Sequence, residues 1–495
     1  MVVERPPHGV VMHKSLLVGA LVAMSATNGC SNPTSPNQGK SSIASVAFFL
    51  DTVTTVPGAE LYLLGTKVID TLGQPQPSYP LAWISSDPAK ATVDSFGFVQ
   101  ILTTGSVNII ASAGGHADTL RIQSVHFDFA SVITGIDHAC GITTQHLPVC
   151  WGGNGNVGRL GIPDSGLVVS GPVAVQGAPQ LSSVTVGSQH SCGLTAAGVA
   201  YCWGSNDRGQ LGIGHVDTRP HAPTPVAGGL TFASLAGGFG NTCGITTAGA
   251  AYCWGAEELG RNGHGGDGSA VDDSFPVVVS GGLTFQTIAV GLLDTCGITT
   301  DSTAYCWGAA DGGEIGAFPL PGSCGSLNGN AFCAAPIPVG GSHKFVAIAA
   351  GMQYECGIVA GGAVYCWGIN TSGSTGSTQS IDSLPVTVGG GHSFVSINAT
   401  YTHTCGLDAV GQAYCWGVGG GGELGNGGIV SSPLPQAVSG ALTFASISAG
   451  FSSCAVTTNS VAYCWGQNLN GVLGVGGYPT PIVMETTPTK VVGQP

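Results

Sequence analysis

Short apolar runs separated by glycine turns recur along the chain from residue 126 to its end. Each copy holds a Phe-x-x-Ile/Leu-x-x-Gly run, a Cys-Gly-Ile/Leu run, a Tyr-Cys-Trp-Gly run and, in most copies, a Pro-x-x-Val run. Short apolar runs bounded by turn residues are typical of β-strands, so each copy predicts four strands. Four strands per copy match a propeller blade, and seven copies predict an all-β, seven-bladed β-propeller over residues 126–495. The copies begin at Cys140, Cys192, Cys243, Cys296, Cys356, Cys405 and Cys454.

Residues 43–125 follow a different pattern. They contain no cysteine, and apolar runs such as residues 61–64 are separated by turn clusters such as residues 73–78. This pattern predicts a small, separate all-β domain in front of the repeats.

Cysteine spacing indicates the redox environment. The chain has 17 cysteines, of which all but Cys30 form pairs nine or ten residues apart along the sequence. Two cysteines ten apart in a hairpin face each other across neighbouring strands, which predicts disulfides and an oxidising compartment. Structural zinc is the alternative, but it favours cysteines two to four residues apart, a spacing that does not recur. The predicted pairs are Cys140–Cys150, Cys192–Cys202, Cys243–Cys253, Cys296–Cys306, Cys324–Cys333, Cys356–Cys366, Cys405–Cys415 and Cys454–Cys464.

The sequence motif of the copies resembles that of a known family. The pattern Gly-x-Ala/Val-Tyr-Cys-Trp-Gly followed by Gly-Gln-Leu-Gly, complete at residues 209–212 and degraded in the other copies, is similar to the regulator of chromosome condensation repeat. This resemblance implies a seven-bladed propeller. It does not imply the exchange-factor activity of the nuclear member, because the repeat motif is structural and an exported acidic chain meets no nuclear GTPase.

A second resemblance covers the N-terminal region. The segment Trp83-Ile-Ser-Ser-Asp, the hairpin Val93-Asp-Ser-Phe-Gly and the strand that follows Gly105 are similar to group 2 bacterial immunoglobulin-like domains. The resemblance implies a β-sandwich over residues 43–125 that acts as a spacer.

The first 30 residues predict export. Translation is expected to start at Met12, and residues 12–30 hold a short positive start, an apolar run and small residues before Cys30. The run is too short to span a bilayer and is typical of a secretory signal. Its end resembles a lipoprotein lipobox, although Thr27 stands where leucine is usual. Acylation of Cys30 is therefore expected, with cleavage near Ala26 as the alternative. In either case residues 31–42 are expected to form a flexible tether.

The amino-acid composition limits the classes of molecule that the protein is expected to bind. The chain has 12 Lys and Arg against 26 Asp and Glu, a balance that cannot build a basic surface for nucleic acid. After the signal, no apolar stretch reaches the ~20 residues of a spanning helix, so membrane contact is expected only through the lipid. A monomer without cofactor is expected.

Two repeated residue types are candidates for function. The tryptophan after each second cysteine predicts core packing, with a carbohydrate-binding row as the alternative. His138, His190 and His403, each two residues before a cysteine, predict a polar group that anchors a turn, with a ligand role as the alternative. No catalytic constellation and no metal site are predicted.

Specificity is expected where the repeat is interrupted. One interruption, residues 257–275, carries Asp267, Asp272 and Asp273, which would either bind Ca²⁺ or form a solvated acidic loop. The other, residues 309–336, carries the Cys324–Cys333 pair. These two loops are the predicted recognition surface, represented by Asp267, Asp272, Asp273, Cys324, Asn328, Asn330, Phe332 and Cys333.

Three functions remain open from the sequence. The first is a lipid-anchored cell-surface or outer-membrane scaffold that binds an extracellular protein or glycan; without the lipid it would be periplasmic or secreted. The second is a secreted hydrolase or lyase, and the third is a secreted proteinaceous enzyme inhibitor.

Overall fold

The computed structural model describes residues 42–63, 66–162, 168–266, 268, 271–477 and 484–495. The signal segment, Cys30 and Asp267 lie outside these residues, as does the tether except Ser42. The regular secondary structure of the described residues consists of β-strands and four short 3-10 turns, so the predicted all-β class is confirmed. The 3-10 turns are η1 (Gly155–Val157), η2 (Glu258–Gly260), η3 (Gly340–Ser342) and η4 (Leu469–Gly471).

The N-terminal region consists of nine strands, β1 to β9. Buried and exposed side chains alternate along β8, where Val107, Ile109 and Ala111 point inward, as expected for a strand with one solvated face. The strands pair in the orders β1-β4, β2-β9-β8-β5 and β3-β7-β6. They are β1 (Ile43–Ala47), β2 (Thr52–Thr55), β3 (Glu60–Tyr62), β4 (Lys67–Asp70), β5 (Ala82–Ser85), β6 (Ala91–Val93), β7 (Phe98–Ile101), β8 (Gly105–Ala113) and β9 (His116–Ser124).

Six repeats form six separate antiparallel sheets in which strand order follows the sequence. The fourth repeat adds β25 beside β26. The first three of these repeats contain β14 (Ser183–Val186), β15 (His190–Leu194), β16 (Ala200–Asn206), β17 (Asp217–Pro225), β18 (Phe232–Gly237), β19 (Asn241–Thr246), β20 (Ala251–Gly255), β21 (Asp273–Val278), β22 (Phe285–Val290), β23 (Asp294–Thr299), β24 (Ala304–Ala309), β25 (Gly325–Leu327) and β26 (Asn330–Pro338). The last three contain β27 (Phe345–Ala350), β28 (Tyr354–Val359), β29 (Val364–Ile369), β30 (Ile381–Thr387), β31 (Ser396–Ala399), β32 (His403–Leu407), β33 (Ala413–Gly417), β34 (Ser432–Ala437), β35 (Phe444–Ala449), β36 (Ser452–Thr457), β37 (Ala462–Gln467) and β38 (Met484–Lys490).

The first repeat is joined to the N-terminal region. Its strands β10 (Phe129–Thr134), β11 (His138–Thr143), β12 (Pro148–Gly153) and β13 (Val168–Ala174) pair in the same order as those of the other repeats. However, β13 also pairs with β2 and β3, so these strands belong to one eleven-stranded sheet. The separation into two sheet systems expected from the sequence is therefore absent at this boundary.

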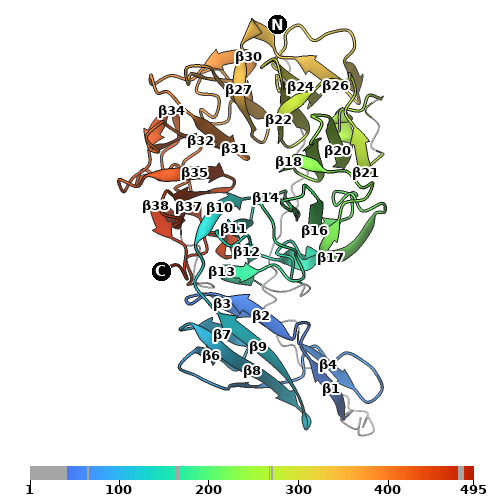
Figure 1. Cartoon of the computed structure of the whole chain (residues 1–495), viewed down its shortest axis with the longest axis vertical. Coiled ribbons are helices and arrows are strands. Elements are labelled where there is room, and N and C mark those ends of the chain that lie inside the picture. Colours follow the sequence, from blue (N-terminus) through green and yellow to red (C-terminus); the bar gives the residue numbers. More distant parts are fainter. Residues whose placement is uncertain (1–41, 64–65, 163–167, 267, 269–270, 478–483) are drawn as a thin grey trace, which may run out of the picture. The chain divides into compact units, whose positions relative to one another are not determined.

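The repeats follow one another around a centre (Figure 1). Each innermost strand contacts the innermost strand of the next repeat, from β10 through β14, β18, β22, β27 and β31 to β35. The last strand of this series, β35, contacts β10 again. The backbone N–H of Phe451 also donates to the carbonyl oxygen of Gly135 at 2.9 Å. The succession of repeats is therefore closed.

Each repeat is held internally by a disulfide across its second and third strands. The two cysteines are register partners, for example Cys192 and Cys202, and in the seven repeats their Cα atoms lie 4.0 to 4.1 Å apart. The hairpin turns at Gly198, whose φ of +79° favours glycine. The eighth bridge joins Cys324 to Cys333, so the structure forms all eight predicted bonds.

Neighbouring repeats are held together by the tryptophans, which are all fully buried. Each indole N–H donates to a backbone carbonyl of the neighbouring repeat at 2.8 to 3.1 Å, which satisfies a polar group that burial would otherwise leave without a partner. The core interpretation is confirmed. The pairs are Trp151 with Val472, Trp203 with Arg159, Trp254 with Gln210, Trp307 with Arg261, Trp367 with Glu314, Trp416 with Ser374 and Trp465 with Glu423.

Removal of one hairpin disulfide tests this account. Replacing Cys192 and Cys202 together by alanine should lower the free energy of unfolding by about 2 to 3 kcal/mol, because a loop of about eleven residues is no longer closed in the unfolded chain. Urea denaturation without reductant, followed by tryptophan fluorescence, measures this loss. The exposed Val410→Ala variant is the control and should unfold at the wild-type midpoint. Peptide mapping that finds the other seven bridges scrambled in the double variant would contradict the formation of each bridge independently of the others.

Candidate functional site

The connections between the third and fourth strands of the repeats lie at one end of the sheets. Because every sheet is an antiparallel meander, the turns between first and second strands lie at the same end. We call this end the loop face. The non-repeated connections, residues 207–216, 256–272 and 310–329, lie on it.

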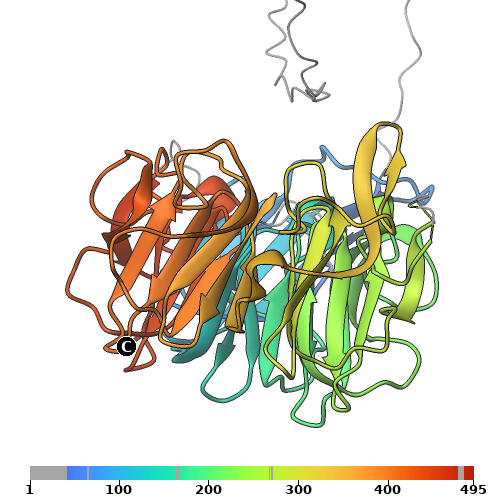
Figure 2. The ribbon, with the colours of Figure 1, turned by 90° about the horizontal axis from the view of Figure 1, so that it is seen from above.

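The hairpin of β25 and β26 is the larger of the two predicted recognition loops. In Figure 2 this hairpin, in yellow, extends beyond the neighbouring strands. Asn328 and Asn330 are exposed at its turn. Phe332 and Cys333 are instead buried, with exposed fractions of 4% and 1%. Their predicted role as contact residues is therefore wrong: Phe332 packs beneath the hairpin and the Cys324–Cys333 bridge holds its two strands together.

Asp272 in the acidic loop is paired with an arginine. The guanidinium of Arg208, from the preceding repeat, donates from Nε to Asp272 Oδ2 at 2.5 Å and from Nη2 to Glu258 Oε1 at 2.6 Å. These contacts raise the pKa of Arg208 further. A carboxylate engaged by a guanidinium is a poor calcium ligand, so the Ca²⁺ alternative does not fit Asp272.

Asp273, the next residue, lies in a cluster that the sequence did not predict. His264 Nε2 lies 3.0 Å from Asp273 Oδ2 and 3.4 Å from Glu257 Oε1. Burial raises the pKa of Glu257 to about 7. The three donor atoms lie within 4.8 Å of one another.

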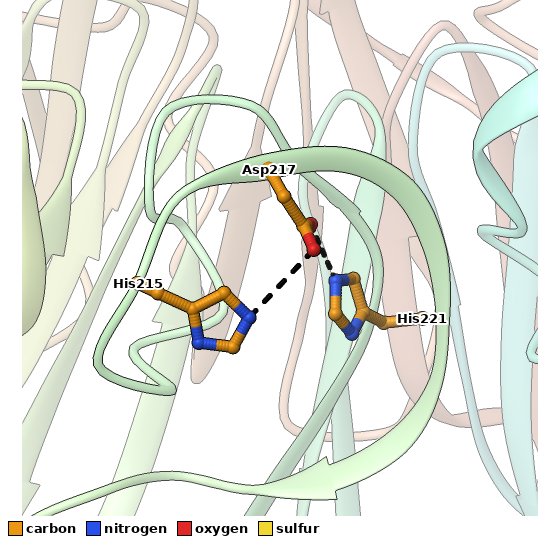
Figure 3. Close-up of side chains that lie close together, drawn as sticks. All are labelled: His215, Asp217 and His221. Atoms are coloured by element: carbon orange, nitrogen blue, oxygen red, sulfur yellow. Dashed lines mark hydrogen bonds and ion pairs between the residues drawn. The ribbon is translucent and has the colours of Figure 1, made fainter.

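A second cluster lies in the second repeat, where His215 precedes β17 and Asp217 and His221 belong to it (Figure 3). His221 Nε2 contacts Asp217 Oδ1 at 2.6 Å, and His215 Nε2 lies 3.7 Å from Asp217 Oδ2. Arg219 Nη2 donates to the same Oδ2 at 3.0 Å. The carboxylate of Asp217 is therefore already balanced by a guanidinium, and His215 is half exposed.

The repeated histidines form contacts between repeats. His138, His190 and His403 are buried, and each Nε2 lies 2.8 to 3.1 Å from a serine or threonine hydroxyl of the next repeat. The hydroxyls of Ser191 and Thr242 themselves donate to the carbonyl that accepts the tryptophan N–H, so these hydroxyls accept from the imidazole. Burial accordingly lowers the pKa of His190 and His403 to about 4. The prediction of a turn anchor is wrong, because the group joins two sheets.

At the same repeated position Asp294 faces an acidic residue. Asp294 and Glu355 are fully buried, with carboxylate oxygens within 4.8 Å, and Glu314 is buried nearby. Burial raises the pKa of Asp294 to about 6, that of Glu314 to about 7 and that of Glu355 well above its usual value. These carboxyl groups therefore keep their protons to a higher pH than exposed carboxyl groups do.

The centre of the loop face is apolar. A cavity of about 40 Å³ there is lined by glycines and by Ile136, Phe239, Leu292, Met352, Tyr401 and Phe451. The rings of Tyr401 and Phe451 lie 5.0 Å apart. Below it, a cavity of about 190 Å³ is lined by the innermost strands.

The closed succession of four-stranded sheets defines an all-β propeller. Within it, residues 181–210 and the segments 197–244 and 410–456 match the regulator of chromosome condensation (RCC1) repeat. The chain thus contains segments similar to RCC1 repeats within an all-β propeller, together with an additional N-terminal β-region.

Known proteins share the repeats and the fold. The ultraviolet-B receptor UVR8 of Arabidopsis thaliana is 27% identical over 60% of this chain and 70% of its own length. The human E3 ubiquitin-protein ligase HERC2 is 26% identical over 54% of this chain, which spans only 5% of that ligase. The structure of Prp20p from Saccharomyces cerevisiae has a TM-score of 0.58 at 20% identity, covering 74% of this chain and 87% of that one. The structure of human WBSCR16 has a TM-score of 0.56 at 18% identity, and the match covers 65% of this chain and 84% of that one. At these identities the structures show the fold alone.

Two observations concern location. Eight disulfides indicate an oxidising environment. None of the helices in the described residues has the length and apolar character needed to cross a membrane.

The buried carboxyl groups give a pH-dependent prediction. The pKa of Glu314 is raised in the folded state, so between about pH 4.5 and 7 the folded chain binds more protons than the unfolded chain, and stability falls as pH rises. Gln210 occupies the equivalent position in another repeat, so Glu314→Gln suits the site. We expect this variant to be more stable than the wild type by up to about 3 kcal/mol at pH 8 and equally stable at pH 4.

Chemical denaturation of both proteins at several pH values measures this difference. Glu485→Gln, which removes a partly exposed carboxylate of the last repeat, is the control and should not reproduce the pH-dependent gain. A constant difference across the pH range would show that folding does not raise the pKa of Glu314.

Proposed function

We propose that this protein is an exported binding scaffold that contacts an extracellular protein or glycan through its loop face. The support is the distribution of exposed apolar side chains. Large apolar side chains exposed to about half or more on this face are Val216, Phe239, Val271, Phe318, Ile429 and Val430, and the last three are 72%, 54% and 75% exposed. Exposed apolar groups concentrated on one face are typical of interaction surfaces.

The repeated residues support the same proposal. The tryptophans, cysteines and histidines of the motif are buried and hold the sheets together, which leaves the non-repeated loops to determine specificity. The disulfide-bonded β25–β26 hairpin keeps its shape before a partner binds, and this lowers the entropic cost of association. The hydrolase or lyase and the enzyme inhibitor stay as alternative hypotheses.

The proposal also includes a seventh blade, an immunoglobulin-like spacer and a lipid anchor. Strands β10–β13 would be a seventh blade, since Trp151 donates to the carbonyl of Val472 in the same way as the other tryptophans bind the preceding repeat. The β2-β9-β8-β5 and β3-β7-β6 sheets would be the two layers of an immunoglobulin-like spacer. Cys30 would carry the lipid that anchors the protein to the membrane.

Two double variants test the proposed binding face. Phe318→Ser with Val430→Ser removes apolar surface from the loop face, and Val395→Ser with Val410→Ser removes it from the opposite end of the sheets. The full-length proteins, immobilised and exposed to extracellular material of the producing cells, are compared by quantitative mass spectrometry of what they retain. The amount of each specifically retained ligand should fall at least tenfold in the first variant and should be unchanged in the second. Equal retention by both, or loss only in the second, would refute the assignment of the face.

A further inference from the structure

The third residue after the tryptophan has a constant role in four repeats. It is asparagine in each, and its Oδ1 accepts a backbone N–H five or six residues further along the chain at 2.9 to 3.3 Å. A neutral amide performs this task without placing a charge in the interior. The four residues are Asn154, Asn206, Asn370 and Asn468.

The third repeat places Glu257 at this position. One carboxylate oxygen, Oε2, accepts the backbone N–H of Asn262 at 2.9 Å and so takes over the task of the asparagine. The other oxygen, Oε1, faces His264. Glu257 is only 4% exposed, and a buried carboxylate is costly unless a positive charge or a proton balances it.

The guanidinium of Arg261 acts on Glu257 through its charge, but it makes its hydrogen bonds elsewhere. Arg261 directs Nε to the carbonyl of Ala256, Nη1 to the carbonyl of Leu292 and Nη2 to Glu258. The charged neighbour that Glu257 shares with His264 is Asp273, another carboxylate. The replacement of a neutral amide therefore brings two carboxylates to one imidazole.

The orientation of His264 is fixed by its other nitrogen. Nδ1 lies 2.8 Å from the carbonyl oxygen of Gly265, which can only accept, so Nδ1 carries the hydrogen. In the neutral ring Nε2 then presents its lone pair toward Glu257 and Asp273. Asp273 Oδ2 is held in turn by the side-chain amide of Asn262 at 2.9 Å. An imidazole fixed by a backbone carbonyl and a carboxylate fixed by an amide are the usual surroundings of metal ligands.

We propose that Glu257 Oε1, His264 Nε2 and Asp273 Oδ2 bind one divalent transition-metal ion of the Zn²⁺ class. One imidazole and two carboxylates suit zinc, whereas Mg²⁺ and Ca²⁺ prefer oxygen ligands alone. The ion places a positive charge between the two carboxylates. Because His264 and Asp273 are partly exposed, the remaining coordination positions are open to water or to a donor atom of a partner.

The cluster of His215, Asp217 and His221 in Figure 3 offers similar donors. Its carboxylate is already paired with Arg219, and it holds no buried charge that requires a cation. It therefore provides the matched control for a zinc titration.

Isothermal titration of the oxidised full chain with Zn²⁺, after treatment with chelator, tests the site. We expect one ion per chain and no binding of Mg²⁺. Glu257→Asn restores the residue of the other repeats and preserves the hydrogen bond to Asn262, so it should fold normally and bind Zn²⁺ at least tenfold more weakly. His264→Ala should show the same loss, and His221→Ala should bind as the wild type does.

Three results would overturn the proposal. The first is a wild-type chain that does not bind Zn²⁺, which would mean that protons balance the carboxylates. The second is an unchanged affinity for Zn²⁺ in both Glu257→Asn and His264→Ala. The third is a loss of Zn²⁺ binding in His221→Ala. Near-ultraviolet circular dichroism of each variant verifies that a loss of binding does not result from unfolding.

Discussion

The hydrogen bond between each buried indole and a carbonyl of the neighbouring repeat is the interaction on which the architecture depends. In the second repeat, the carbonyl oxygen of Arg159 accepts hydrogen bonds from the indole N–H of Trp203 and from the hydroxyl of Ser191. The hydroxyl of Ser191 accepts in turn from His138 of the preceding repeat. A buried indole without an acceptor would cost about 1 to 3 kcal/mol, so no repeat satisfies its polar groups alone. Neighbouring glycines are equally constrained: a Cβ on Gly212 would lie 2.7 Å from Trp254 Nε1.

Sequence reasoning could predict most of the fold because the signals are local and repeated. Four strands per repeat, hairpin disulfides and buried tryptophans follow from residues within about 50 positions of one another. The shared sheet depends on distant residues and was not predicted. A signal did exist: β13 is buried along nearly its whole length, whereas β17 is mostly exposed. Its sequence, Val168-Val-Ser-Gly-Pro-Val-Ala, has the more apolar character of a strand covered on both sides.

The candidate site was harder to predict, because it depends on departures from the repeat. The predicted loops are those that interrupt the repeat, and they include Asp272 and Phe332, of which one is paired with Arg208 and the other is buried. Comparison of equivalent positions would have been more informative. Glu257 replaces an asparagine, and Glu355 stands where five of the other six repeats hold serine or threonine. A single sequence shows that such a residue is different, but only the structure shows which side chains surround it.

The strand shared between the N-terminal region and the first repeat has a mechanical consequence. A spacer connected only through a linker would let the ring swivel freely at the end of residue 125. Here β13 bonds to β2 and β3, Thr55 Oγ1 donates to the carbonyl of Pro172, and Val56, Leu61, Val169 and Val173 belong to one hydrophobic core. The ring therefore has to turn together with the strands β2 and β3 that hold it.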